Sequence, residues 1–359
     1  MVKKGREPSS GFIAGPIADS VFLIGAPLVA VLVFLPFKEI PIMNYPLPTG
    51  ATVFKANTLT TAFIGIVIYS HLFIVFFRSH LDLQIFKLHP IRFTVVPVGL
   101  FVSVYLSTWA LAAVLVLAVW WDVYHSALQT FGIGRIYDMK KGNDPLAGRQ
   151  LDRIFNLLLY AGPILGGSSL MLHLMIHQRD LKDVPGLEAA VFEWIPASAE
   201  YSPYLALPLL GLGIPFCIFY LYSYWRLHQR GYRVSFQKTA LLAILALVSI
   251  ACWGFNSFGE AFFVMNFFHA WQYFFIVWHT ERKNMTSTFK LSRFSFGPQI
   301  ALALFLFIGV GYGVWSHVDW PAFQFSKRTM ISLLLVISIM HFWYDGFIWS
   351  VRKGQVRVS

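Results

Sequence analysis

The stretch that decides the fold is residues 92–131, RFTVVPVGLFVSVYLSTWALAAVLVLAVWWDVYHSALQTF, in which Arg92 and Asp122 are the only Asp, Glu, Lys or Arg residues. A transmembrane helix needs about 20 consecutive apolar residues, so a run of this length can cross the hydrocarbon of a bilayer twice. Ser107 and Thr108 interrupt the run near its middle and predict the point where one span ends and the next begins. The sequence therefore predicts an all-α polytopic membrane protein.

The composition of the whole chain agrees with lipid as its main solvent. Of 359 residues, 57% are hydrophobic and 13% are charged, and the mean hydropathy is +0.62. A soluble protein has about 45–50% apolar and about 25% charged residues. No P-loop, GxSxG or GxGxxG motif stands in a suitable context, which argues against the common soluble nucleotide-binding and hydrolase classes. Cys217 and Cys252 lie inside apolar runs and are interpreted as packing residues.

Apolar runs between charged or Pro/Gly breaks predict ten spans in one domain that covers residues 1–359. The predicted spans are approximately residues 18–37, 58–77, 92–107, 109–131, 154–176, 203–225, 239–257, 260–279, 299–316 and 329–350. With a cytoplasmic N-terminus, an even number of spans also places the C-terminus in the cytoplasm.

The distribution of basic residues supports the count of ten. Under this topology 22 of the 28 Lys and Arg residues fall in cytoplasmic segments, whereas merging the two spans around Ser107 would leave only 10 inside. The positive-inside rule therefore favours two separate spans there. The net charge of +11 is interpreted as cytoplasmic loop charge and not as a nucleic-acid-binding surface. The expected location is a bacterial inner membrane.

Four of the predicted spans carry a histidine deep inside: His71, His125, His269 and His341. At a helical rise of about 1.5 Å per residue, all four lie roughly 9–15 Å from the cytoplasmic ends of their spans. Placing an ionisable group at this depth in the membrane costs free energy, so we expect the four histidines to form one functional site. The pattern predicts one metal site, and imidazole ligands favour iron, copper or zinc over magnesium or calcium.

Polar residues share a helix face with three of these histidines. Asp122 and Gln129 flank His125 at three and four residues, Gln272 follows His269 by three, and Asp345 follows His341 by four. A carboxylate or amide in such a position can accept the second N–H of a ligating imidazole and fix its orientation. We therefore expect these four residues to support the metal ligands.

Two further histidines, His80 and His279, lie at the predicted cytoplasmic rim. They are candidates for additional ligands, which would allow a second metal ion. Their position at the rim is equally compatible with interfacial residues that bind no metal.

The segments VYHSALQTFG (residues 123–132), NFFHAWQYF (266–274) and MHFWYDGF (340–347) resemble the bacterial carotene-cleaving dioxygenases of the Brp/Blh type. The likeness lies in single histidines on several helices and in the His-x3-Asp element formed by His341 and Asp345. The resemblance implies one iron ion held by histidines of a polytopic membrane protein, and a carotenoid cleaved with dioxygen.

The sequence thus predicts a membrane iron oxygenase that acts on a lipophilic substrate, such as a carotenoid or another lipid, with dioxygen and an unidentified redox partner. Copper, zinc and haem are the alternative cofactors. Membrane di-iron desaturases use clustered histidine boxes, whereas these four histidines stand singly. Two other functions stay open. One is a haem electron-transfer protein with axial histidines, and the other is a transporter that relays protons through intramembrane His and Asp.

Overall fold

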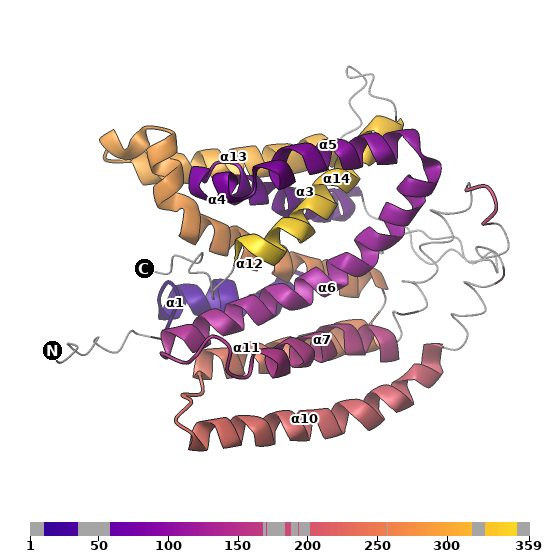
Figure 1. Cartoon of the computed structure of the whole chain (residues 1–359), viewed down its shortest axis with the longest axis vertical. Coiled ribbons are helices and arrows are strands. Elements are labelled where there is room, and N and C mark those ends of the chain that lie inside the picture. Colours follow the sequence, from indigo (N-terminus) through magenta and orange to yellow (C-terminus); the bar gives the residue numbers. More distant parts are fainter. Residues whose placement is uncertain are drawn as a thin grey trace.

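The structure is a computed structural model of the chain, shown in Figure 1. It describes residues 11–34, 58–167, 184–187, 202–256, 258–317 and 327–349, together with Leu170 and Glu193. Every regular element within these ranges is a helix. The prediction of an all-α protein is confirmed for this part of the chain.

The elements follow the predicted spans in order along the chain. They are α1 (Pro16–Asp19), the π-helical turn η1 (Ser20–Ile24), α2 (Ala26–Phe34), α3 (Thr58–Ser79), α4 (Leu83–Leu88), α5 (Pro90–Leu106), α6 (Thr108–Lys140), α7 (Arg149–Gly166), η4 (Ser202–Leu205), α10 (Ala206–Gln229), α11 (Phe236–Ser249), η5 (Ile250–Gly254), α12 (Phe258–Thr288), η6 (Leu291–Arg293), α13 (Gly297–His317) and α14 (Lys327–Ile348).

Six helices of the described chain are long and apolar enough to cross a membrane. They cover Thr108–Lys140, Ala206–Gln229, Phe236–Gly254, Ala261–Thr288, Gly297–Ser316 and Arg328–Ile348. A bent pair, Pro16–Ile24 with Ala26–Phe34, would make a seventh span, and Gly65–Ser79 and Pro90–Leu106 are shorter apolar helices. Length and composition therefore support an α-helical integral membrane protein.

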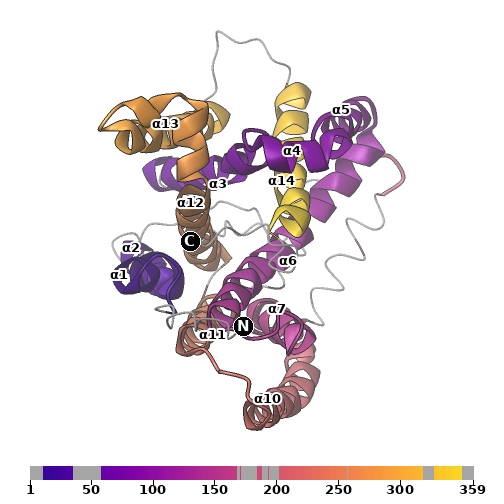
Figure 2. The same cartoon turned by 60° about the vertical axis from the view of Figure 1, so that its left-hand side comes forward.

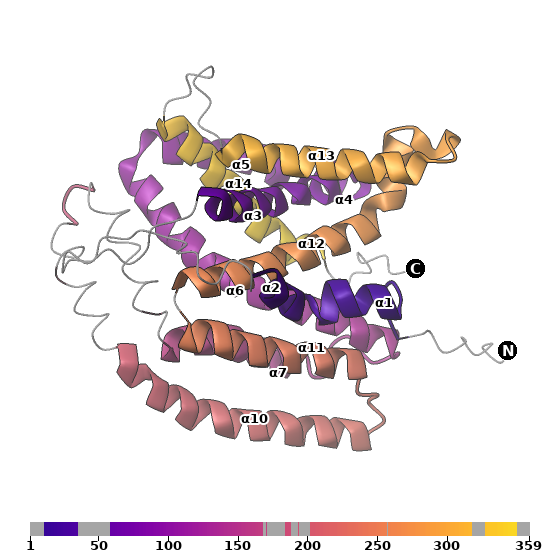
Figure 3. The ribbon, with the colours of Figure 1, turned by 180° about the vertical axis from the view of Figure 1, so that it is seen from behind.

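The helices lie side by side and alternate in direction, as Figures 1 and 3 show from opposite sides. The connections from α3 to α5, α6 to α7, α10 to α11 and α12 to α13 all lie at one end of the bundle, together with the start of α1. Figure 2 shows α12 near the middle of the bundle and α10 at its edge. This arrangement lets α12 contact α3, α2 and α13 at once.

Residues 92–131 form two helices, as the sequence predicts. The break lies at Ser107, whose backbone is extended and whose hydroxyl accepts a hydrogen bond from the Ala110 N–H at 3.2 Å, a normal N-cap for α6. However, α6 continues to Lys140, well beyond the predicted end at residue 131. The extra turns carry Arg135 and Asp138, whose charges are compensated by partners on other helices.

Those partners are Asp152 of α7 and Lys238 of α11. Arg135 Nη1 lies 2.6 Å from Asp152 Oδ2 and 2.9 Å from Asp138 Oδ2. Lys238 Nζ lies 2.8 Å from Asp138 Oδ2 and 2.7 Å from Asp152 Oδ2. Two cations and two anions thus form one buried network. Because this network compensates the charges, the residues after 131, which the sequence places beyond the end of the span, stay helical.

The predicted span 18–37 is not one straight helix in the structure. The two parts meet at Gly25 with a bend of 62°. A Cβ on Gly25 would lie 2.3 Å from the Ser20 carbonyl oxygen, so the bend requires glycine. Asp19 fixes the first part, since Oδ2 accepts hydrogen bonds from the Ile13 N–H at 2.6 Å and the Tyr137 hydroxyl at 2.9 Å. The ends of this and three other predicted spans, at residues 35–37, 171–176, 257 and 350, lie outside the described residues.

Candidate metal centre

Four helices bring the four predicted histidines together in the interior. His71 comes from α3, His125 from α6, His269 from α12 and His341 from α14, and none is more than 4% exposed. Ring centroids are 5.0 Å apart for His71 and His269, 5.0 Å for His269 and His125, 4.7 Å for His125 and His341, and 5.1 Å for His341 and His71. These four contacts close a ring of imidazoles.

Most nitrogens of this ring lack a well-formed hydrogen bond. Neither ring nitrogen of His71 or His269 makes a hydrogen bond of good geometry, nor does Nδ1 of His341, although the rings of His71 and His341 lie near backbone groups of α3. A buried polar group left unpaired costs about 1–3 kcal/mol, so several in one place call for an explanation. Lone pairs that converge from four helices are what a transition-metal ion requires.

The distances fit one ion. His71, His269 and His341 each offer a nitrogen, and these three atoms lie within 4.8 Å of one another. Two nitrogens bonded to one metal at about 2.1 Å are separated by about 3.0 Å at a right angle and by at most about 4.2 Å. His341 Nε2 and His125 Nε2 are 3.1 Å apart, which already matches the right-angled value. His125 and Asp345 form a second such group with His341, so the two groups share one histidine.

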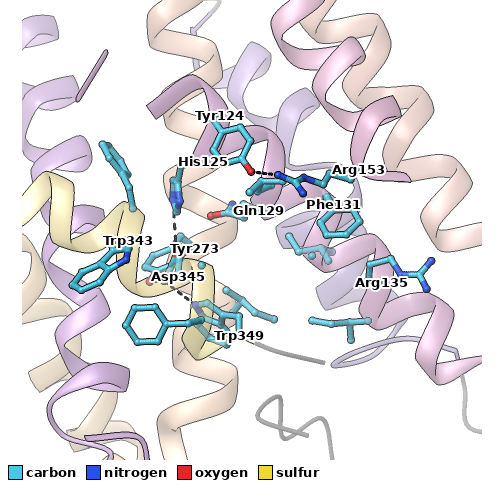
Figure 4. Close-up of a pocket in the computed structure, with 18 of the residues that line it drawn as sticks. Tyr124, His125, Gln129, Phe131, Arg135, Arg153, Tyr273, Trp343, Asp345 and Trp349 are labelled. Atoms are coloured by element: carbon cyan, nitrogen blue, oxygen red, sulfur yellow. Dashed lines mark hydrogen bonds and ion pairs between the residues drawn. The ribbon is translucent and has the colours of Figure 1, made fainter. Parts of the chain in front are cut away.

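Asp345 points a carboxylate oxygen toward His125 (Figure 4). Its Oδ2 lies 3.8 Å from His125 Nε2 and 4.0 Å from His341 Nε2. Its Oδ1 accepts hydrogen bonds from the Tyr273 hydroxyl at 2.8 Å and the Trp349 indole N–H at 2.9 Å. Asp345 was expected to orient an imidazole, but its free oxygen faces Nε2 atoms, so the geometry makes it a candidate ligand with His125 and His341.

The two glutamines have partners other than the imidazole nitrogens. Gln129 Nε2 donates to the His269 carbonyl at 3.0 Å and to Gln272 Oε1 at 3.0 Å. Gln272 Nε2 in turn donates to the Leu23 carbonyl at 2.7 Å. This amide chain holds the backbone of α12 against α6 and η1, and so positions His269 through its main chain.

Asp122 does not contact His125 through any hydrogen bond that the structure shows. Its carboxyl lies on the side of α6 that faces α7, near enough to Tyr160 to interact with it electrostatically. The expected role of Asp122 beside the imidazole therefore has no geometric support.

His80 and His279 lie apart from the four-histidine ring. The Ser79 hydroxyl is 2.7 Å from His80 Nδ1 and the Phe93 carbonyl is 3.1 Å from His80 Nε2, so both nitrogens are engaged. His279 stacks on Phe275 at 5.8 Å. Neither belongs to a group of described residues that could hold a metal ion.

A buried ion pair that the sequence analysis did not identify ties the same helices together. Arg78 at the end of α3 pairs with Glu281 of α12, and both side chains are 2% exposed. Arg78 also donates to the Ile348 carbonyl at 3.0 Å and lies 4.1 Å from the centroid of the Trp349 ring. The opposite charges near the inner ends of two predicted spans were visible in the sequence, but their pairing was not.

A cavity of about 600 Å³ adjoins the ring on the side of His125 and Asp345. Its walls come from α6, α7, α12 and α14 and the connection before α7 (Figure 4). Aromatic rings line much of it: Trp121, Tyr124, Phe131, Tyr273, Phe342, Trp343, Phe347 and Trp349. The aromatic content of the sequence was the only hint of such a cavity.

Comparison with protein-family models, curated proteins and solved structures gives no match for this chain. The arguments about function below therefore rest on the residues and their geometry.

Proposed function

We propose that the protein is a membrane-embedded iron oxygenase whose single metal ion is held by His71, His125, His269, His341 and Asp345. The observation that carries the proposal is the closed ring of four buried imidazoles, most of whose nitrogens have no hydrogen bond of good geometry. A set of imidazoles with one carboxylate is typical of non-haem iron(II) sites.

Bound iron would supply activation of dioxygen. The chain itself would hold the ion, keep bulk water away from it and bind the substrate. The aromatic cavity beside His125 and Asp345 suits a lipophilic substrate. Cleavage of a carbon–carbon double bond to two carbonyl groups takes up both atoms of dioxygen, so a carotenoid-type cleavage would consume no reductant overall. The resemblance to the Brp/Blh dioxygenases supports this reaction class.

The proposal includes a topology of ten spans with both termini in the cytoplasm of a bacterium. Four basic connections at one end of the bundle support it, since the positive-inside rule assigns that end to the cytoplasm. The ring of histidines then lies in the cytoplasmic half of the protein.

A haem function receives less support from the geometry. Two axial histidines need a flat slot for the porphyrin between them. Here each imidazole contacts two others at 4.7–5.1 Å between centroids, and rings from four helices fill the space around the centre. A proton-relay transporter would use His125, His341 and Asp345, whose polar atoms lie within 4.8 Å of one another. That function would not require metal.

Metal analysis of the purified protein tests the proposal. We expect about one iron per chain, and loss of most of it in the His125→Ala and His269→Ala variants. His228→Ala is the matched control, because His228 is an exposed histidine at the end of α10. An absorption spectrum with a Soret band would assign the site to haem, and a metal-free wild-type protein would favour the transporter. Full metal content in His125→Ala would overturn the ligand assignment.

A further inference from the structure

The cavity beside the four-histidine ring has an unusual charge balance. Its lining includes Arg135, Arg149 and Arg153, whereas Asp345 is the only carboxylate among the described residues that line it. One oxygen of Asp345 accepts hydrogen bonds from Tyr273 and Trp349, and the other faces His125 and His341. Among the described residues of its lining, the cavity therefore has three cations and one carboxylate that already has other partners.

Arg135 is neutralised by two carboxylates, whereas the contacts of the other two arginines are with aromatic residues. Arg135 pairs with Asp138 and Asp152. Arg153 donates to the Tyr124 hydroxyl at 2.5 Å, and its guanidinium lies 5.9 Å from the centroid of that ring. The Arg149 guanidinium lies 5.9 Å from the Phe131 ring. Neither Arg149 nor Arg153 pairs with a carboxylate of the described chain.

These two arginines stand four residues apart on α7 and so share one face of the helix, where like charges repel each other. Arg149 is exposed, and Arg153, one turn further along α7, is half-buried. Figure 4 shows Arg153 pointing toward Tyr124, the neighbour of His125. Tyr124 and Phe131 are separated by about 10 Å along α6. The two guanidiniums thus follow one another from the exposed part of the cavity lining toward Tyr124, which precedes His125.

A purely apolar ligand would leave the two guanidiniums unpaired. Arginine recognises carboxylate and phosphate through paired N–H groups, and it does so best where water is partly excluded. An amphiphile would satisfy both parts of the cavity, with its head group on the arginines and its chain against the aromatic rings. The positive-inside rule explains basic residues at this end of the bundle in general, but not two that line a cavity leading to a buried site.

We propose that the cavity binds an amphiphile with an anionic head group, a carboxylate or a phosphate, held by Arg149 and Arg153 with its apolar part directed toward His125 and Asp345. This inference rests on the proposed function, since it names the substrate class of the same site. It narrows that class from any lipophilic molecule to acidic lipids.

Binding of dodecanoate, dodecyl phosphate and dodecanol to the purified full-length protein in a neutral detergent tests the inference. Calorimetry measures binding without turnover. We expect dodecanoate or dodecyl phosphate to bind at least about tenfold more tightly than dodecanol, and the better of the two identifies the head group as carboxylate or phosphate. The double variant Arg149→Gln, Arg153→Gln should lose that preference, because glutamine keeps hydrogen bonding but removes the charge.

Arg293→Gln is the matched control, since Arg293 is exposed at the same end of the bundle and lies over an aromatic ring, 4.9 Å from the Phe294 centroid. It should keep the preference. Equal affinity for dodecanol, or an equal loss in Arg293→Gln, would overturn the inference.

Metal content measured on the same samples separates this inference from the proposed function. A metal-loaded protein without the preference refutes the acidic substrate alone. A metal-free protein that retains the preference refutes the oxygenase and leaves the anion-binding cavity standing.

Discussion

The sequence predicted that Asp345 belongs to the candidate metal centre, but it did not predict how its carboxylate is oriented there. Its spacing of four residues from His341 placed both on one face of α14, which the structure confirms. The spacing could not predict which carboxylate oxygen of Asp345 faces the histidines. Tyr273 and Trp349 decide this, because they bind Oδ1 and thereby turn Oδ2 toward His125 and His341. Tyr273 reaches Asp345 from α12, whereas Trp349 follows Asp345 by four residues in the same stretch of chain.

Replacement of Asp345 by asparagine should weaken metal binding and leave the fold intact. The amide oxygen can still accept from Tyr273 and Trp349, but the second position no longer offers a negative oxygen. Loss of a partner next to a ligand costs about 10–100-fold in metal affinity, and loss of a ligand costs at least as much. Competition with a chelator measures the affinity, and thermal unfolding of the apo-protein monitors the fold.

Tyr273→Phe provides the comparison for this variant. It removes one hydrogen bond to Oδ1 and leaves the carboxylate charge in place, so metal affinity should fall less than in Asp345→Asn. If Asp345→Asn bound iron as tightly as the wild type while Tyr273→Phe did not, Asp345 would be a structural residue and not a ligand.

At the scale of elements, α13 packs against α3 through glycine. A Cβ at Gly313 would lie 2.3 Å from both the Ile66 carbonyl oxygen and the Ser70 hydroxyl. Gly309, one turn earlier on the same face, faces Ile74, whose Cγ2 would lie 2.8 Å from an added Cβ. Small residues four apart are the usual means by which membrane helices approach closely. Because α3 carries His71, this contact also affects the position of one histidine of the candidate metal centre.

Gly313→Leu should destabilise the protein by about 1–3 kcal/mol or more through overpacking. The matched control is Gly311→Leu on the same helix, where an added Cβ meets nothing within 4 Å. Leucine favours helix equally at both positions, so propensity cancels in the comparison. The midpoint of thermal unfolding in detergent is the measurement. Equal midpoints for the two variants would show that α13 and α3 do not pack as closely as the structure shows.

The positions of helices and the break at Ser107 could be predicted from the sequence, whereas the end of α6 and the bend at Gly25 could not. The break at Ser107 has a local cause, a serine that caps α6, and the sequence shows it. The continuation of α6 through Arg135 and Asp138 depends on Asp152 and Lys238, which reach it from other helices. The bend at Gly25 depends on a close backbone contact. Contacts with other helices cannot be predicted from the pattern of apolar residues along one segment.

The same distinction applies to the candidate site. The depth of a histidine in the membrane follows from its position in its own span. The sequence alone therefore predicted that His71, His125, His269 and His341 lie at the same depth. Which side of each helix faces which neighbour is decided by packing. Gln129 therefore reached the His269 carbonyl and not an imidazole, and the arginines of the cavity were not recognised as a pair.

At the scale of the whole molecule, orientation determines where the cavity opens. Arg149 lies at the end of the bundle that also holds the connections from α6 to α7 and from α12 to α13. If that end is cytoplasmic, an acidic amphiphile enters from the cytoplasmic side or the inner leaflet. The opposite orientation would place the cavity mouth, and the ring of histidines with it, near the outer surface.

Single cysteines at two exposed serines distinguish these orientations. Ser107 lies between α5 and α6 at one end of the bundle, and Ser292 lies between α12 and α13 at the other. With Cys217 and Cys252 replaced by serine, a membrane-impermeant maleimide should label Ser107→Cys in intact cells and Ser292→Cys only after the membrane is opened. The reverse pattern would invert the topology. Failure to label Ser107→Cys in either condition would show that the break between α5 and α6 does not reach water, and the count of ten spans would then be wrong.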